Sequence, residues 1–392
     1  MNPTNKVSMQ TIKATTAWLF AAFMLAGACS AQPKTADIRI SIALSDITDS
    51  VIIYPMNKIE KRWGTPVRTL PVNGKATVSL PLDEATNLLI YANRGNKGQM
   101  MMAMPMNLFV VGVPGETLTV SGTSTDYRIS GSPLYRQYGE AIGLAIPQKG
   151  YQHLADTLQN MQKQGISQDS LKVFRTLRLQ AMTERKNAAI LRYIRTNPRQ
   201  EASVLLLSEL DTDGFFEADP LLDQSVKEGR LKGIYEAVRA SYVKRKQKAE
   251  AAKTLAPGAP APDFTLDDLN KRPVSLSGLR GRYVILDFWG SWCGWCIKGF
   301  PDMKKYYDKY KGRIEILGID CNDTDAKWRE AVRKHQLPWL HVRNTDQTAV
   351  DVKYAISGYP TKVIVDPEGR IVRIVVGEDP KFYDYLDELM AQ

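Results

Sequence analysis

Short runs that alternate apolar and polar residues occupy the first part of the chain, between residues 37 and 120. The turn-forming pairs Asn73-Gly74 and Pro114-Gly115 separate some of them. Alternation with a period of two places apolar side chains on one face of a strand, and short strands joined by turns are typical of antiparallel sandwiches. We therefore predict an antiparallel β-sandwich over residues 37–130, with strands at 38–42, 76–80, 88–91 and 117–120.

Long stretches of helical pattern follow Gly131-Ser-Pro133. They predict a helical connector over residues 133–253, with helices at 154–164, 171–195, 202–210 and 231–252. Residues 254–263 then hold three prolines and a glycine, which cannot continue a helix and favour extended backbone. We interpret this segment as a linker at a domain boundary.

The last part of the chain combines strands and helices. After a short extended pair at 264–266 and 274–276, the pattern predicts strands at 283–289, 314–320, 361–365 and 371–376, and helices at 293–310, 326–335, 349–354 and 381–390. Strand–helix–strand followed by a hairpin and a helix indicates a mixed sheet. The predicted fold class is α+β multidomain, in which a sandwich and a helical connector precede an α/β domain over residues 264–392.

The first residues have the pattern of an export signal. Lysines precede a short apolar stretch at 17–26, and small residues surround Cys29. This order predicts a signal peptide over residues 1–31. Residues 25–29 resemble a bacterial lipoprotein signal, in which Cys29 is lipidated, and cleavage near residue 28 or 31 without lipid is the alternative. We expect a protein of the periplasm or cell envelope that touches the membrane only through such an N-terminal anchor.

The chain is basic overall, with a formal net charge of +10. From Leu255 to the end, however, 20 Lys or Arg face 20 Asp or Glu, so the excess lies upstream. Part of it is a basic run at 239–253. A nucleic-acid site would need aromatic or base-reading residues interleaved with such charges, and an exported protein rarely meets nucleic acid. We interpret the run as a solvated helix face and expect no nucleic-acid partner.

Cysteine is scarce, with four in the chain. Once Cys29 is assigned to the signal, Cys293, Cys296 and Cys321 remain, which allows at most one bridge. Cys293 and Cys296 stand three positions apart at the start of a predicted helix, where they can close a disulfide that is attacked again. We interpret Cys321 as a small buried residue, with a third redox thiol as the alternative. A methionine-rich run at 100–106 favours packing over a soft-metal site.

The neighbours of the two thiols suggest roles. A helix N-terminus stabilises a thiolate, so Cys293 is the predicted nucleophile, and Cys296 would resolve the mixed disulfide. Asp287 lies in an apolar strand, where burial should raise its pKa and allow proton exchange with Cys296 through a water. A solvated strand face is the alternative for Asp287.

Residues 287–296, Pro301 and Gly358-Tyr-Pro-Thr361 together resemble the thioredoxin fold, and residues 259–392 are similar to the TlpA/ResA-like thiol–disulfide oxidoreductases. The resemblance implies that Cys293 and Cys296 form a catalytic, redox-active disulfide without cofactor or metal, and that Pro360 is cis. The expected substrate-positioning residues are Trp292, Trp295, Tyr359 and Pro360. The upstream part is similar to β-rich regions fused to such domains in exported proteins of Bacteroides-type bacteria.

This sequence departs from the family pattern at two places. Gly294-Trp295 stands between the cysteines where thioredoxin has Gly-Pro, and Gly299 stands where ResA-like proteins carry a glutamate. Because the intervening dipeptide changes thiolate stability, the redox potential stays open.

The predicted function is an exported thiol–disulfide oxidoreductase that reduces or exchanges disulfides of cell-envelope proteins and receives electrons from a membrane thiol donor. One alternative is a thiol peroxidase of the peroxiredoxin type, although Gly290 stands where those enzymes have threonine. A zinc module would need His335 and His341 as ligands. A non-enzymatic envelope binding or scaffold protein with a redox-sensing domain is a further alternative.

Overall fold

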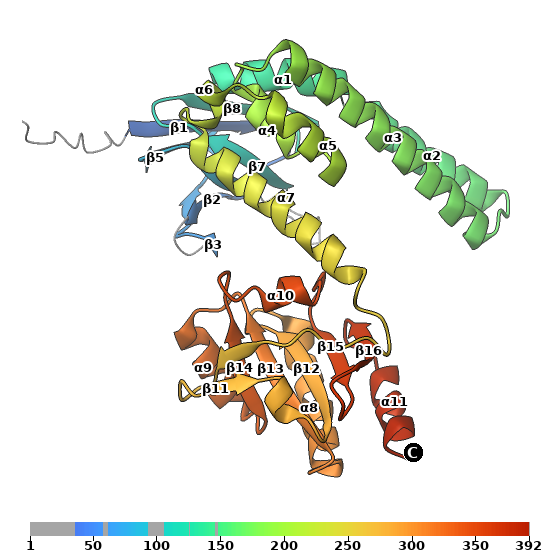
Figure 1. The fold of residues 1–392 in the computed structure, drawn as a ribbon. Coiled ribbons are helices and arrows are strands. Elements are labelled where there is room, and N and C mark those ends of the chain that lie inside the picture. Colours follow the sequence, from blue (N-terminus) through green and yellow to red (C-terminus); the bar gives the residue numbers. More distant parts are fainter. Residues whose placement is uncertain (1–35, 58–61, 93–105, 125, 146–147, 392) are drawn as a thin grey trace, which may run out of the picture. The chain divides into compact units, whose positions relative to one another are not determined.

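The computed structural model describes residues 36–57, 62–92, 106–124, 126–145 and 148–391 (Figure 1). The predicted signal peptide, Cys29 and the methionine-rich segment up to residue 105 lie outside the described residues. The described residues form two compact units, one within residues 1–206 with 221–235 and the other within residues 207–220 with 236–392. The predicted domain boundaries at 133, 254 and 264 remain predictions.

The first unit contains two β-sheets that share one core. One sheet has the strand order β5-β1-β8-β9. The other has the order β3-β2-β6-β7, and its fifth strand, β4, also pairs with β2. Buried side chains of both sheets, such as Ile40 and Leu88, belong to a single hydrophobic cluster. The strands are β1 (Ala36–Leu44), β2 (Val51–Asn57), β3 (Arg62–Trp63), β4 (Val67–Thr69), β5 (Ala76–Leu82), β6 (Thr86–Ala92), β7 (Met106–Gly112), β8 (Thr117–Gly122) and β9 (Tyr127–Ser130).

The antiparallel prediction is confirmed for these sheets with one difference, because β1 and β8 pair in parallel. Alternation of apolar and polar residues is the same in both kinds of pairing, so the pattern could not reveal the direction.

Helices follow the sheets, as predicted. They are α1 (Pro133–Ala145), α2 (Gln148–Lys163), α3 (Gln168–Thr196), α4 (Ala202–Leu207), α5 (Thr212–Ala218), η1 (Asp219–Leu221), α6 (Gln224–Lys227) and α7 (Lys232–Ala252). The long α3 begins where the Ser167 hydroxyl accepts a hydrogen bond from Ser170 N, and it ends before Asn197-Pro198. The pattern missed α1, α5 and α6.

The basic run on α7 is partly neutralised within the second unit. Lys244 Nζ and Lys248 Nζ lie 3.0 and 3.1 Å from the Oδ2 atom of buried Asp351. Burial alone would raise the pKa of Asp351, but hydrogen bonds from Lys244 and Asn344 and the two lysine charges hold it below its ordinary value. The interpretation as a solvated helix face is therefore wrong for these two lysines.

The rest of the second unit is a mixed sheet with helices, preceded by the hairpin of β10 (Thr265–Asp267) and β11 (Pro273–Ser275). The sheet order is β14-β13-β12-β15-β16 (Figure 1). The pairs β12–β13 and β13–β14 are parallel, and the pairs β12–β15 and β15–β16 are antiparallel. Its strands are β12 (Tyr283–Trp289), β13 (Ile314–Cys321), β14 (Leu340–Asn344), β15 (Thr361–Val365) and β16 (Ile371–Val376). The helical elements are η2 (Ser277–Leu279), α8 (Gly294–Lys309), α9 (Asp325–His335), α10 (Val350–Lys353) and α11 (Lys381–Met390).

Strand β12 is buried on both faces, which explains its nearly continuous apolar run. Ile285 and Trp289 join a cluster with Cys296 and Phe300 of α8, whereas Val284, Leu286 and Phe288 join the cluster of the opposite face. Asp287 lies two residues from both Ile285 and Trp289, so its side chain belongs to the same face of the strand, the α8 face. The predicted mixed sheet is confirmed, and the pattern missed β14.

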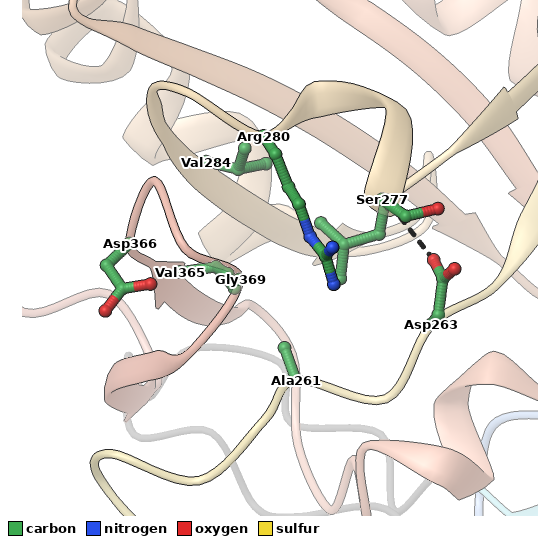
Figure 2. Close-up of a pocket in the computed structure, with 9 residues that line it drawn as sticks. Ala261, Asp263, Ser277, Arg280, Val284, Val365, Asp366 and Gly369 are labelled. Atoms are coloured by element: carbon green, nitrogen blue, oxygen red, sulfur yellow. Dashed lines mark hydrogen bonds between the residues drawn. The ribbon is translucent and has the colours of Figure 1, made fainter.

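The predicted linker contains a turn, in which Ala259 N donates to Ala256 O, and it bonds to other parts of the second unit. Gly258 N donates to Ile371 O, and Ala261 N donates to Gly369 O. Figure 2 shows a hollow nearby, where the Arg280 side chain extends between Gly369 and Ser277 and where Ser277 N donates to Asp263 Oδ1 at 3.0 Å. Its volume of about 20 Å³ has space for about one water, so we do not interpret it as a ligand site.

Candidate redox site

Two cysteines form a disulfide at the N-terminus of α8. Cys293 is the N-cap residue, and its Sγ accepts a hydrogen bond from Cys296 N at 3.1 Å. Cys293 is 6% exposed and Cys296 is 2% exposed. On reduction, the free amides and the positive end of the helix dipole would stabilise a thiolate at Cys293. The pair can therefore exchange disulfides, with Cys293 as the more exposed residue of the two.

Two exposed tryptophans flank the disulfide. Trp292 is 52% exposed and Trp295 is 62% exposed. The Trp292 ring meets the Tyr359 ring edge to face at 5.1 Å, and Trp292 Nε1 donates to Cys321 O at 3.0 Å. Lys298 Nζ lies over the Trp295 ring, 4.9 Å from the ring centroid. Three of the four predicted substrate-positioning residues thus border the cysteines as exposed or half-buried aromatic side chains.

The fourth, Pro360, follows a cis peptide bond, as the resemblance implied. Pro360 O accepts a hydrogen bond from Gly377 N at 2.7 Å, which ties the cis turn to the end of β16. Tyr359 packs against the cluster that contains Cys293 and Cys296. The fold therefore brings the two predicted site segments together although more than sixty residues separate them.

Gly290 makes room for the Trp292 ring. A Cβ at position 290 would lie 2.4 Å from Trp292 Nε1 and 3.0 Å from Cys321 O. The threonine that peroxiredoxins carry at this position does not fit beside the ring as it stands. Sequence reasoning noted the missing threonine and had no signal for this contact.

We expect Gly290→Thr to displace the Trp292 ring and to lower the free energy of unfolding by about 1–3 kcal/mol, the usual cost of overpacking. Tryptophan fluorescence and urea unfolding would measure both effects. Gly294→Ala is the matched control, because a Cβ at position 294 meets nothing within 4 Å. Equal stabilities of the two variants would contradict the prediction.

Asp287 is buried, with 1% exposure, so the alternative of a solvated strand face is wrong. Its register partner on β15 is Lys362, and its partner on β13 is Gly318. Burial raises the pKa of Asp287 to about 6, the Lys362 charge opposes that rise and the Glu378 charge adds to it. Asp287 Oδ1 has no hydrogen-bond partner among the described residues. The carboxyl group can therefore exchange a proton near neutral pH.

Three further residues, which sequence reasoning missed, surround this carboxyl group. Lys362 Nζ donates to Glu378 Oε2 at 2.6 Å, and Tyr383 OH donates to Glu378 Oε1 at 3.0 Å. A lysine within the apolar strand 361–365 was the available signal, because lysine is almost never fully buried unless it is paired.

The loop before the cysteines is held by a carboxylate. Ser291 donates from its N to Asp323 Oδ2 at 2.6 Å and from its Oγ to Asp323 Oδ1 at 2.7 Å. Burial, reinforced by the nearby Asp323 charge, raises the pKa of Asp320 to about 9. Asp320 is thus a neutral acid at pH 7.

Cys321 is free and 1% exposed. Burial raises the pKa of its thiol well above the ordinary value, although a hydrogen bond with Tyr359 lowers it somewhat. A buried, protonated thiol is inert in exchange reactions, which agrees with the interpretation of Cys321 as a small buried residue.

In the described part of the chain, no three His, Cys, Asp or Glu side chains come together as metal ligands would. His341, one of the two histidines that a zinc site would need, is buried beside Trp289 and Trp339, and burial lowers its pKa to about 4. No helix of the described residues has the length and apolar character that a membrane crossing requires.

Comparisons with known proteins agree on the last third of the chain. Residues 257–374 match a family model described as the AhpC/TSA family. The chain is 31% identical over 137 residues to thiol-disulfide oxidoreductase ResA of Bacillus subtilis (strain 168), which covers 34% of this chain and 76% of that protein. It is 33% identical over 125 residues to ResA of Bacillus thuringiensis (strain Al Hakam), and this match covers 32% of this chain and 72% of that protein.

Solved structures of similar proteins carry related names. The thioredoxin domain of a thiol-disulfide oxidoreductase from Bacteroides vulgatus has 33% identity and a TM-score of 0.33, with 34% of this chain and 98% of that chain covered. A putative thiol:disulfide interchange protein DsbE from Chlorobium tepidum has 27% identity and a TM-score of 0.33, and the match covers 35% of this chain and 96% of that chain.

Proposed function

Because the chain belongs, through its C-terminal region, to the ResA family of thiol–disulfide oxidoreductases, we propose that it reduces or exchanges disulfides of cell-envelope proteins through Cys293 and Cys296. The observation that carries the proposal is the Cys293–Cys296 disulfide at the N-terminus of α8, on the sheet face to which buried Asp287 belongs. The pattern of residues 1–31 supports export, with lipidation at Cys29 as the proposed anchor.

The reaction begins with the reduced pair. The Cys293 thiolate attacks one sulfur of a client disulfide, whose S–S bond breaks, and the other client sulfur leaves as a thiolate and takes a proton from solvent. A new S–S bond now joins Cys293 to the client. The exposed rings of Trp292 and Trp295 and the half-buried ring of Tyr359 offer the client an apolar surface beside this bond.

The second step releases the client. Asp287 takes the proton of the Cys296 thiol through a water, and the Cys296 thiolate attacks Cys293 Sγ. The bond to the client breaks, the client sulfur leaves as a thiolate that is then protonated, and the Cys293–Cys296 disulfide forms. Two electrons have passed from the pair to the client, and a membrane thiol donor returns two electrons to the pair. No cofactor takes part in this scheme.

Trapping experiments would test the proposal. In Cys296→Ala the resolving thiol is gone, so mixed disulfides between Cys293 and clients should accumulate in envelope extracts and be released by dithiothreitol. Mass spectrometry would identify them, and Cys293→Ala/Cys296→Ala is the control that should trap nothing. Equal capture by both variants would refute the proposal.

The reduction potential would decide the direction of electron flow. A value near that of thioredoxin, about −270 mV, would indicate a reductase, and one near about −120 mV an oxidant. Equilibration of the Cys293–Cys296 pair with glutathione buffers would measure it.

A thiol peroxidase is the second candidate, since residues 257–374 match a family model described as AhpC/TSA. The contact between Gly290 and Trp292 counts against it. Rapid consumption of hydrogen peroxide, with oxidation of Cys293 to sulfenic acid and turnover by dithiothreitol, would support this candidate over disulfide exchange.

A further inference from the structure

Gly299 lies within α8, three residues after Cys296, where glycine is a much poorer helix former than alanine. Such a glycine usually has a packing reason. A Cβ at position 299 would lie 2.4 Å from Oε2, 2.6 Å from Cδ and 2.8 Å from Oε1 of Glu378. The Glu378 carboxylate therefore occupies the space that a side chain at position 299 would fill.

Lys362 connects this carboxylate to the redox site. It stands directly opposite Asp287 across the β12–β15 pair, and its side chain is 2% exposed. Its ammonium lies 2.6 Å from Glu378 Oε2, and no ion pair between Lys362 and Asp287 is formed. The buried lysine is thus neutralised by Glu378 and not by the aspartate that faces it.

We infer that Glu378 is a positioning residue of the redox site. Its carboxylate lies against Gly299 and binds the Lys362 ammonium, and this contact preserves the ability of Asp287 to keep and exchange a proton. The inference rests on the proposed function, in which Asp287 acts on Cys296. Glu378 follows β16 and thus comes from a different element than either cysteine.

The charges around Asp287 support this role. Lys362 and Glu378 together are neutral, so ionisation of Asp287 adds a net negative charge to a buried cluster, which is costly. Among the described residues, Lys362 and Glu378 are the charges that act on Asp287. On the other elements, Gly318 of β13 has no side chain, His341 of β14 is neutral, Tyr383 of α11 has a raised pKa, and Cys296 of α8 is disulfide-bonded.

Glu378 is also well held. Tyr383 OH donates to Glu378 Oε1 at 3.0 Å and lies 3.4 Å from Gly299 O. Residues of β15, α8 and α11 therefore determine where the carboxylate sits. Without its negative charge, the Lys362 ammonium would act fully on Asp287, stabilise the ionised carboxylate and make it a weaker base.

The test uses the full-length protein and an aromatic disulfide that releases two coloured thiolates. The first release reports attack by Cys293, and the second reports attack by Cys296 on the mixed disulfide. We expect the rate of the second release in the unmodified protein to rise with pH around about 6, the pKa of Asp287. In Glu378→Gln the midpoint should fall by at least about one pH unit, a tenfold lower proton affinity.

Companion variants separate this role from a merely structural one. Gly299→Ala pushes the carboxylate aside and should lower the midpoint as Glu378→Gln does. The double variant Lys362→Met/Glu378→Gln removes both charges and should return the midpoint to the original value or above it. Glu368→Gln, in the exposed β15–β16 turn, is the matched control and should change nothing.

An unchanged midpoint in both Glu378→Gln and Gly299→Ala would overturn the inference while leaving the proposed function intact. Failure of the first release in the unmodified reduced protein would instead overturn the proposed function. Circular dichroism of each variant would confirm that a changed midpoint belongs to folded protein.

Discussion

Cys293→Ser should abolish the reduction of insulin disulfides by this protein, with a rate at least about 10³-fold below that of the unmodified chain. The reason is that the thiolate is the nucleophile of disulfide exchange, whereas a serine hydroxyl remains protonated at neutral pH. Cys293 is the more exposed of the two cysteines and caps the helix whose N-terminus would stabilise its thiolate. Turbidity of insulin reduced by dithiothreitol with catalytic amounts of protein would measure the rate.

Cys321→Ala is the matched control, because the Cys321 thiol is buried and has a raised pKa. It should retain the parent rate. If Cys293→Ser kept that rate, neither the helix-capping cysteine nor the proposed mechanism would account for the activity.

Asp287→Asn should slow the resolving step by about 10²-fold, the lower part of the range for a general base. The asparagine amide preserves the shape of the buried side chain but cannot accept the Cys296 proton. The second thiolate release from the aromatic disulfide would measure this step, and the first release should stay near the parent rate. Equal slowing of both releases would point to a general disturbance of the site and not to the loss of a base.

The same variant should also change how stability depends on pH. Burial raises the pKa of Asp287 from 3.8 to about 6, so the folded state binds this proton more tightly than the unfolded state does. The resulting stabilisation is complete below the unfolded pKa and is lost as pH rises through about 6. Two pKa units correspond to about 3 kcal/mol, so Asp287→Asn should gain up to about 3 kcal/mol over the parent at pH 8. Urea unfolding at pH 4 and pH 8 would measure this gain.

Sequence patterns located most elements of the second unit. The predicted strands 283–289, 361–365 and 371–376 and the helix 381–390 have the same bounds in the structure. Strands buried on both faces appear as apolar runs, and the apolar spacing and turn residues between them are local signals. The strand Leu340–Asn344 was missed because it is short, lies at the edge of the sheet and includes His341 and Arg343.

The candidate site likewise contains residues that the sequence identifies and residues that it does not. Cys293 and Cys296 were recognisable because their spacing and their place at the start of a helix are local features. Tyr359 and Pro360 were assigned through resemblance, and the cis bond is present in the structure. Lys362, Glu378 and Tyr383 were not identified. Lys362 has an unusual context, a lysine within an apolar strand, but that context does not name its partner, and Glu378 and Tyr383 have ordinary sequence contexts.

By itself, the sequence determined that this chain carries a dithiol exchange pair on a strand–helix unit, because thiol spacing and helix position suffice for that chemistry. Only the tertiary structure decided how the proton affinity of Asp287 is set. That affinity depends on which charges share a buried, low-dielectric space. The space contains Lys362 of β15 and Glu378, whose carboxylate lies against Gly299, and these residues come together only when the sheet has formed.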